Sequence, residues 1–168
     1  MWPISFVGGQ SLRRALQVKA GVGRAILVMT EGEIRRVATA VGFPLPECYR
    51  TTMLAYPFAP QSVAADGYML PNDPEAVISL NNGGAQPRGI AQPFFIGNDL
   101  GEEMFFVDAL KVDSPVYVYE LETKKHRVLA DSWDGYLAHM RKLDVEIAAD
   151  EQAENQRMLT KRWWQFWR

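Results

Sequence analysis

The chain has 168 residues, of which 48% are hydrophobic and 23% are charged, and its formal net charge is -2. This length and balance are typical of one globular domain, which at this size buries a core without disulfides or metals. The charge lacks the basic excess of a nucleic-acid binder, and a single cysteine, Cys48, excludes a disulfide framework or a multi-cysteine metal site.

No stretch of the sequence is apolar enough to cross a membrane. The longest apolar run, residues 25–29, is far shorter than the roughly 20 residues that a membrane-spanning helix needs. Arg24 abuts this run and no small-residue cleavage site follows it, so a secretory signal peptide is not expected. We therefore expect a cytoplasmic protein without a stable membrane span.

Residues 1–29 are expected to form a loose extension before the domain. The charged residues of this stretch are all basic, namely Arg13, Arg14, Lys19 and Arg24. The acidic excess therefore lies in the rest of the chain. An acid-free head that contains glycine is either a basic arm or a segment that merely precedes the domain.

Two helices are expected at the start of the domain. Thr30 and Glu33 have the spacing of a capping box, and an apolar stripe of helical period follows as far as Gly42, a residue suited to a left-handed helix end. Pro46 suits the first position of the second helix, because its missing N–H costs nothing there. Pro57 ends that helix, and a long loop is predicted after it.

Five short strands are predicted next, at residues 76–80, 93–96, 104–107, 116–119 and 127–130. Each is an apolar or alternating run bounded by Gly, Pro, Asn or Asp. Spacings of about ten residues leave no room for crossover helices, so most pairings are expected to be antiparallel. The charged stretch 120–125 is predicted to be a hairpin turn.

A closing helix is predicted after Ser132, a suitable N-cap residue, with apolar side chains at helical period as far as Ile147. The elements together predict an α+β fold, with N-terminal helices and a C-terminal helix beside a mostly antiparallel sheet. We expect the domain to span residues 30–147.

Residues 148–168 are expected to continue as a polar helix and to end in a tail of aromatic and basic residues. If the tail is helical, Trp163, Phe166 and Trp167 share one face. Each of the three would gain roughly 2–3 kcal/mol on full burial. The cluster is therefore expected either to fold back onto the domain or to bind a partner.

No catalytic or metal-binding set can be assembled from the sequence. Cys48 has only His126 and His139 as imidazole partners, and its place in a helix favours a small buried or half-buried side chain. Two isolated histidines do not form a metal site. We therefore expect no enzyme activity, no cofactor and no metal, and keep a small hydrolase that uses Cys48 as an alternative of another class.

The acid- and glycine-rich segment 97–103 is interpreted as a tight turn between two strands, because the spacing of a calcium loop is absent. In a functional interpretation, Asp99, Glu102 and Glu103 form an acidic rim that meets a basic partner. The two interpretations are compatible, since a turn can present charges.

Four motifs follow one another in order along the chain. They are GFPLPECYR (42–50), IGNDLGEEMFFVD (96–108), SPVYVY (114–119) and LADSWDGYL (129–137). They resemble the G-x-x-L-P-x-x-Y-R, I-G-x-D-G-x-G-x-x-x-F-x-D, P-V-Y-x-Y and L-A-x-S-F-x-x-F-L motifs of the SUKH superfamily, over about residues 31–143. Leu100 and Glu102 stand where that family often has glycine.

The resemblance implies an α+β domain that binds another protein and has no catalytic set. Bacterial members of this superfamily commonly neutralise a toxin by binding it, and some members act as regulatory scaffolds. We therefore expect an immunity protein for a bacterial toxin, whose acidic body suits a basic partner such as a nuclease. The alternative is a regulatory or scaffold module in cell-envelope or secretion assembly, docked through the aromatic tail.

Overall fold

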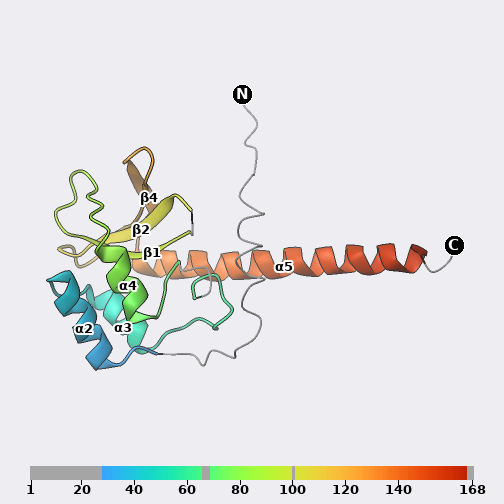
Figure 1. Cartoon of the computed structure of the whole chain (residues 1–168), viewed down its shortest axis with the longest axis horizontal. Coiled ribbons are helices and arrows are strands. Elements are labelled where there is room, and N and C mark those ends of the chain that lie inside the picture. Colours follow the sequence, from blue (N-terminus) through green and yellow to red (C-terminus); the bar gives the residue numbers. More distant parts are fainter. Residues whose placement is uncertain (1–27, 66–68, 100, 166–168) are drawn as a thin grey trace.

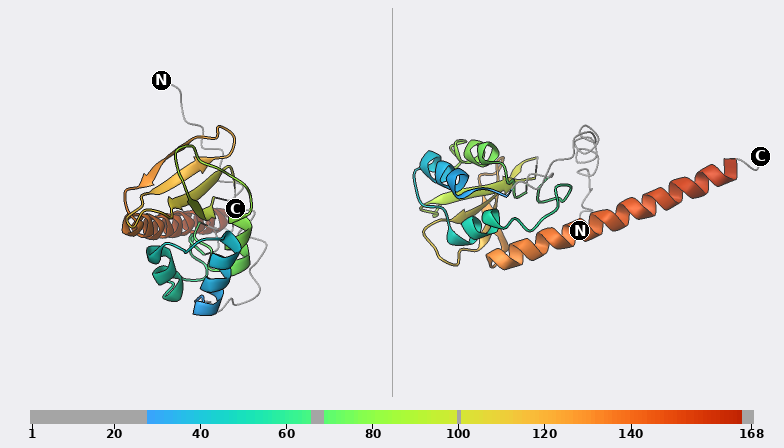
Figure 2. Two further views of the ribbon diagram at one scale, coloured as in Figure 1. Left: turned by 90° about the vertical axis from the view of Figure 1, so that its left-hand side faces the viewer. Right: turned by 90° about the horizontal axis from the view of Figure 1, so that it is seen from below.

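The structure, a computed structural model, describes residues 28–65, 69–99 and 101–165, with side chains as far as residue 157 (Figure 1). It confirms the α+β fold: helices lie beside a four-stranded antiparallel sheet, and the last helix runs out of the domain (Figures 1 and 2). The N-terminal segment 1–27 lies outside the described residues.

The first helix is capped as predicted. α2 (Glu31–Val41) begins after Thr30, whose hydroxyl oxygen accepts a hydrogen bond from Glu33 N at 3.2 Å. The Glu33 carboxylate accepts one from Thr30 N at 2.7 Å, which completes the capping box. Gly42 ends the helix with a left-handed backbone, φ 84°, which favours glycine.

The second helix differs from its predicted bounds by one or two residues. α3 (Glu47–Leu54) begins directly after Pro46, which is the N-cap residue and not the first helical residue. It ends before Tyr56, whose buried side chain therefore belongs to the following loop. A loop was predicted over residues 57–75. The described part of residues 57–73 contains no helix or strand, but Pro74 and Glu75 already belong to the next helix.

Residues 76–80 were predicted to form a strand, and this prediction is wrong, because they belong to the helix α4 (Pro74–Asn81). The Asp73 carboxylate caps this helix by accepting from Glu75 N at 3.4 Å, with Pro74 at its start. Asp-Pro-Glu is a helix-start pattern. The short apolar run that follows does not by itself distinguish a buried strand from a buried helix.

The strands lie side by side in chain order: β1 (Pro93–Asn98), β2 (Glu103–Asp108), β3 (Val116–Glu120) and β4 (His126–Ala130). All three pairings are antiparallel, as predicted. The predicted hairpin turn between β3 and β4 is also present, with Lys124 at φ 57° donating to Glu120 O at 3.0 Å. The register of this pair shifts near Leu129, because Val116 and Tyr117 face Ala130 and Val128.

The sheet buries side chains on both of its faces. The main core joins one face to α2, α3, α4 and α5, and Phe94, Phe105 and Val118 are among its members from the sheet. On the other face, a smaller cluster of Phe95, Met104, Phe106 and Tyr119 packs against side chains of the connection between α4 and β1. The helical and alternating periods of the sequence predict a set of core residues. Of these, Val41 is half-buried, and the others are buried: Ile34, Val37, Tyr49, Met53, Phe105, Val107, Val116, Val118, Trp133, Leu137 and Met140.

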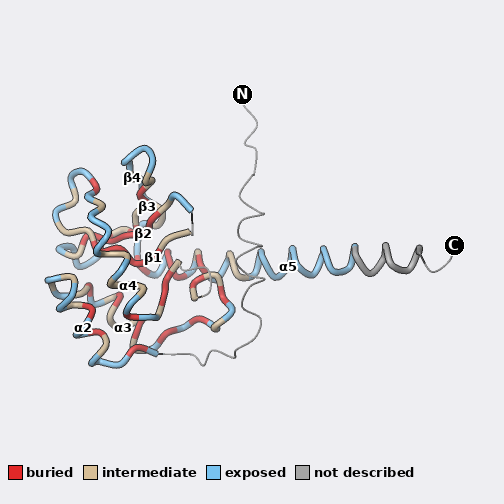
Figure 3. The backbone as a smooth tube through the Cα atoms, viewed as in Figure 1, coloured by how far each residue is buried: buried red, intermediate tan, exposed pale blue. Residues whose placement is uncertain are grey.

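The closing helix is longer than its packed part. α5 (Trp133–Gln165) starts after Ser132, whose hydroxyl accepts from Gly135 N at 3.1 Å, as the predicted cap should. Its first turns are buried as far as Met140, and residues 145–157 are exposed (Figure 3). At 1.5 Å per residue the whole helix is about 50 Å long. It continues without a break to Gln165 and extends away from the domain (Figure 2).

Among the described residues, packing extends one residue before the predicted domain start at residue 30. Met29 is buried in the main core, and its backbone N–H donates to Met53 O at 3.1 Å. At the other end of the domain, Asp144 of α5 accepts a hydrogen bond from Val63 N at 2.7 Å, which holds the long loop against the helix. None of the helices in the described part of the chain has the length and apolarity that crossing a bilayer requires.

Candidate partner-binding site

The connection between β1 and β2 is a tight turn closed by Asp99. The Asp99 carboxylate accepts hydrogen bonds from Gly101 N at 2.8 Å and from Glu103 N at 3.1 Å, and Asp99 N donates to Glu103 O at 3.2 Å. A Cβ atom at Gly101 would lie only 3.2 Å from the Asp99 carboxylate. Glycine at that position therefore allows the aspartate to close the turn. Leu100 lies outside the described residues.

The three acids predicted as a rim have three different roles. Asp99 is used within the turn, and half-buried Glu103 forms an ion pair with Arg127 of β4, with 3.2 Å between Nη2 and Oε1. Glu102 is exposed, and among the described residues its carboxylate has no partner. The backbone carbonyl of Glu102 accepts from Leu121 N at 2.8 Å, which braces the turn against the β3–β4 turn. With respect to the described residues, the rim therefore presents one unpaired carboxylate, that of Glu102.

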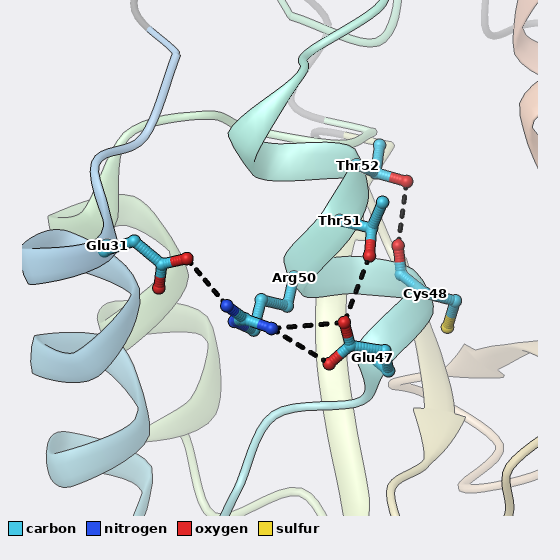
Figure 4. A network of polar contacts seen from close by, with 6 residues as sticks. All are labelled: Glu31, Glu47, Cys48, Arg50, Thr51 and Thr52. Carbon is cyan, nitrogen blue, oxygen red and sulfur yellow. Dashed lines mark hydrogen bonds and ion pairs between the residues drawn. The ribbon is translucent and has the colours of Figure 1, made fainter.

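Arg50, the last residue of the first SUKH-like motif, connects α2 to α3 (Figure 4). Its guanidinium donates to the Glu31 carboxylate at 2.6 Å and to the Glu47 carboxylate at 3.1 Å. These two acids raise the pKa of Arg50. The arrangement is a surface ion-pair network that links α2 to α3, and sequence reasoning gave it no role.

The neighbours of Arg50 in the motif lie in or beside the core. Tyr49 is wholly buried and meets the ring of Phe94 edge-on, with 4.8 Å between the centroids. Cys48 is half-buried, as predicted, and this burial raises the pKa of its thiol. A raised pKa disfavours the thiolate that a nucleophilic cysteine needs.

The two histidines belong to different elements, His126 to β4 and His139 to α5. His126 is half-buried against the rings of Phe106 and Tyr117, with centroids 5.8 and 5.6 Å away, and His139 is a half-buried residue of α5. Within the described ranges, no group of three or more His, Cys, Asp or Glu side chains is placed to hold a metal ion.

The aromatic cluster of the tail is placed only in part. Trp163 belongs to α5, whereas its side chain and the residues Phe166 and Trp167 lie outside the described part of the chain.

Sequence reasoning missed several exposed apolar side chains on the connection between β2 and β3 and on α5. The largest exposed fractions are those of Leu110 (66%), Val112 (92%) and Val145 (70%). Leu110 and Val112 could have been found from their position between strands, next to charged residues. Val145 lies outside the apolar stripe of its helix, and this departure from the helical period can also be seen in the sequence.

Comparisons with protein-family models, with curated proteins and with solved structures find no match to this chain. The basis for a functional proposal is therefore the chain's own geometry, together with its SUKH-like motifs.

Proposed function

We propose that the chain is a non-enzymatic protein-binding domain, an immunity protein that neutralises a bacterial toxin in the cytoplasm by binding it directly. The observation that supports this best is the turn between β1 and β2, which holds the exposed carboxylate of Glu102 on a loop braced by Asp99 and Leu121. A charge on a preformed loop favours binding, because the loop loses little conformational entropy when the partner arrives. The resemblance of the motifs to those of the SUKH superfamily is the reason for expecting a toxin as the partner.

The direct test is coexpression with a toxin encoded beside the gene of this protein. We expect a stable complex and loss of the toxin's activity. Glu102→Lys should slow association with a basic toxin and weaken its dependence on salt, because the attraction that steers the encounter is reversed. Asp150→Lys makes the same charge change on the exposed part of α5 and serves as the matched control.

Two outcomes would contradict different parts of the proposal, namely the position of the toxin and the immunity function itself. Neutralisation that is equally sensitive to Asp150→Lys would place the toxin elsewhere than at the turn. Absence of both a complex and protection would show that the immunity proposal is wrong for that toxin.

A second function, a scaffold module that docks through α5, is supported by a different observation. Val145, 70% exposed, and Ile147 place apolar surface on α5 just beyond the domain. Such surface on a projecting helix suits a partner helix or groove. Deleting residues 158–168 or introducing Val145→Asp should then abolish binding of an envelope or secretion component and leave toxin neutralisation unchanged.

A further inference from the structure

The last helix continues well beyond the part that packs on the domain. Asp144 accepts a hydrogen bond from Val63 N at 2.7 Å, and residues 145–157 after it are exposed. The helix runs on to Gln165 and points away from the domain (Figure 2). We call residues 145–165 the projecting part of α5; at 1.5 Å per residue it is about 30 Å long. Helices in proteins owe most of their stability to packing against another element, which the exposed residues of this part do not find within the described chain.

Acidic and basic residues are segregated along this end of the chain. All charged residues between 144 and 154 are acidic, and all those between 155 and 168 are basic. The acids are Asp144, Glu146, Asp150, Glu151 and Glu154, and the bases are Arg157, Lys161, Arg162 and Arg168. The sign changes close to the middle of the projecting part. The helix dipole does not explain this order, because it favours acids only in the first turn and α5 begins at Trp133.

The segregation places like charges next to each other along the helix. Residues three or four apart are neighbours on a helix, and like charges at that spacing destabilise it. Asp150 is four residues from both Glu146 and Glu154, and Arg157 is four residues from Lys161. Within residues 144–168, opposite charges have this spacing only where the sign changes, at Glu154 and Arg157. The charge order therefore weakens a lone helix, and a neighbour of the opposite order would offset the repulsion.

An antiparallel copy of the same helix has that opposite order. A parallel copy would place acids beside acids and bases beside bases. In an antiparallel pair with a two-fold axis at residue 156, Glu151 of one copy lies beside Lys161 of the other. Asp150 lies beside Arg162 in the same register. The axis repeats both pairs, so the acidic half of each helix meets the basic half of its mate.

The length of the projecting part suits this register. Gln165 of the second copy would lie beside Ile147, so the two helices can pair along their projecting parts without reaching Asp144, where α5 is bound to the domain. The available length of helix and the position of the sign change thus give the same axis.

Residue sizes also correspond in this register. The positions of Trp163 and Trp164 in the second copy lie beside Ala149 and Ala148, which are exposed. Large residues opposite small ones allow two helices to approach closely. Val145, which is 70% exposed, lies next to these alanines and would be covered in part.

We propose that the projecting part of α5 is a homodimerisation surface, on which a second copy of the chain pairs its own α5 antiparallel about a two-fold axis near residue 156. A two-fold interface must be self-complementary, and the reversal of charge along the helix makes it so. The paired charges lie at the surface, so the dimer is weak and dissociates as salt is added. Pairing through α5 does not involve the toxin, so the purified chain alone is sufficient for the test.

The test is sedimentation velocity on the full chain over a concentration series at low and high salt. We expect a monomer–dimer equilibrium that shifts to monomer when salt is added. Two double variants place like charges beside each other in the antiparallel pair: Asp150→Lys with Glu151→Lys, and Lys161→Glu with Arg162→Glu. Each should weaken the homodimer by at least about tenfold, because every change acts twice across the axis.

A 1:1 mixture of the two double variants should dimerise again. In the mixed pair, the new lysines of one variant face the new glutamates of the other, and the unchanged charges are matched as well. Arg88→Glu with Lys125→Glu is the matched control, because it makes the same change of charge as Lys161→Glu with Arg162→Glu at exposed positions outside α5. This control should leave the dimer as it is.

Weakened homodimers of both double variants, a restored dimer in their mixture and an unchanged control together support antiparallel pairing of α5. A chain that is monomeric at every concentration overturns it. A dimer that neither double variant weakens overturns it too, because a parallel pair or another surface would give that result. Pairing of α5 is likewise overturned if the control weakens the dimer equally, or if the mixture stays monomeric, since the variants would then have lost more than charge complementarity.

Discussion

The indole N–H of Trp133 donates a hydrogen bond to the hydroxyl oxygen of Thr52, 2.8 Å away, and so joins the first turn of α5 to α3. Thr52 in turn donates to Cys48 O at 2.8 Å. The Trp133 ring packs against Tyr49 and Tyr136, at centroid distances of 6.2 and 5.9 Å. One side chain therefore anchors the long helix to both the polar and the apolar parts of the core.

Replacing Trp133 by alanine should lower the free energy of unfolding by about 3–5 kcal/mol, because a buried aromatic is removed and leaves a cavity. Trp133→Phe should cost less, since the ring packing remains and mainly the bond to Thr52 is lost. Urea titration measures both effects. Val112→Ala, at a side chain that is 92% exposed, is the control and should change stability by less than about 0.5 kcal/mol. A loss below about 1 kcal/mol for Trp133→Ala would contradict the burial assigned to it.

The side-chain amide of Asn81 bonds to the backbone of β1 at the edge of the sheet: it donates to Phe95 O at 2.8 Å and accepts from Phe95 N at 2.9 Å. Asn81→Leu should cost about 1–3 kcal/mol, because the N–H and C=O groups of Phe95 lose their partner in a partly buried place. Asn82→Ala changes the adjacent asparagine, which is exposed and serves as the control. Equal stabilities of the two variants in denaturant titration would show that the hydrogen bonds of the Asn81 amide to Phe95 do not stabilise the domain.

Three buried tyrosines differ in the partners of their hydroxyl groups. Tyr56 donates to Leu70 O at 2.6 Å and Tyr136 to Met69 O at 2.5 Å, whereas the Tyr49 hydroxyl has no hydrogen-bond partner among the described residues. Tyr→Phe should therefore cost about 1–2 kcal/mol at positions 56 and 136, and be neutral or stabilising at position 49. Thermal and urea unfolding of the three single variants provide the comparison. A clear loss on Tyr49→Phe would reveal a partner for that hydroxyl.

The same tyrosines predict how stability responds to alkali. Burial raises the pKa of Tyr49, Tyr56 and Tyr136 above the usual tyrosine value of about 10. A pKa that is higher in the folded state means that the folded chain binds more protons than the unfolded chain above that value. Stability is therefore fully present below about pH 10 and falls as the pH rises further. Urea midpoints across this range should decline, and less steeply for Tyr49→Phe. An unchanged slope in that variant would refute the assignment.

Local chemistry explains which elements could be predicted from the sequence. The capping box of Thr30 and Glu33, the left-handed end at Gly42 and the cap at Ser132 each depend on residues within a few positions of one another. The prediction of a strand at residues 76–80 is wrong because periodicity over so few positions is ambiguous, whereas Asp73 and Pro74 form the start of a helix.

The candidate site was predictable only in part, because its contacts depend on register. The turn at Asp99 follows from adjacent residues. The pairing of Glu103 with Arg127 requires two strands separated by β3, and the bond of Arg50 to Glu31 requires a specific angle between helices. Neither is encoded in local spacing, so three acids that look equivalent in the sequence differ in the folded chain.

Met29 is buried, whereas the residues before Val28 are expected to contribute little to the stability of the domain. Met29 is 2% exposed and its N–H is bonded to Met53 O, so Met29→Ala should cost about 2–5 kcal/mol through the cavity it leaves. Removing residues 1–27 should change the free energy of unfolding by less than about 0.5 kcal/mol, because the first capped amphipathic helix starts only after Thr30. Val28→Ala, at a 43% exposed side chain, is the control for the substitution. If the shortened chain unfolded at clearly lower urea than the full chain, residues 1–27 would contribute to the folded domain, and its start would have to be placed earlier than Met29.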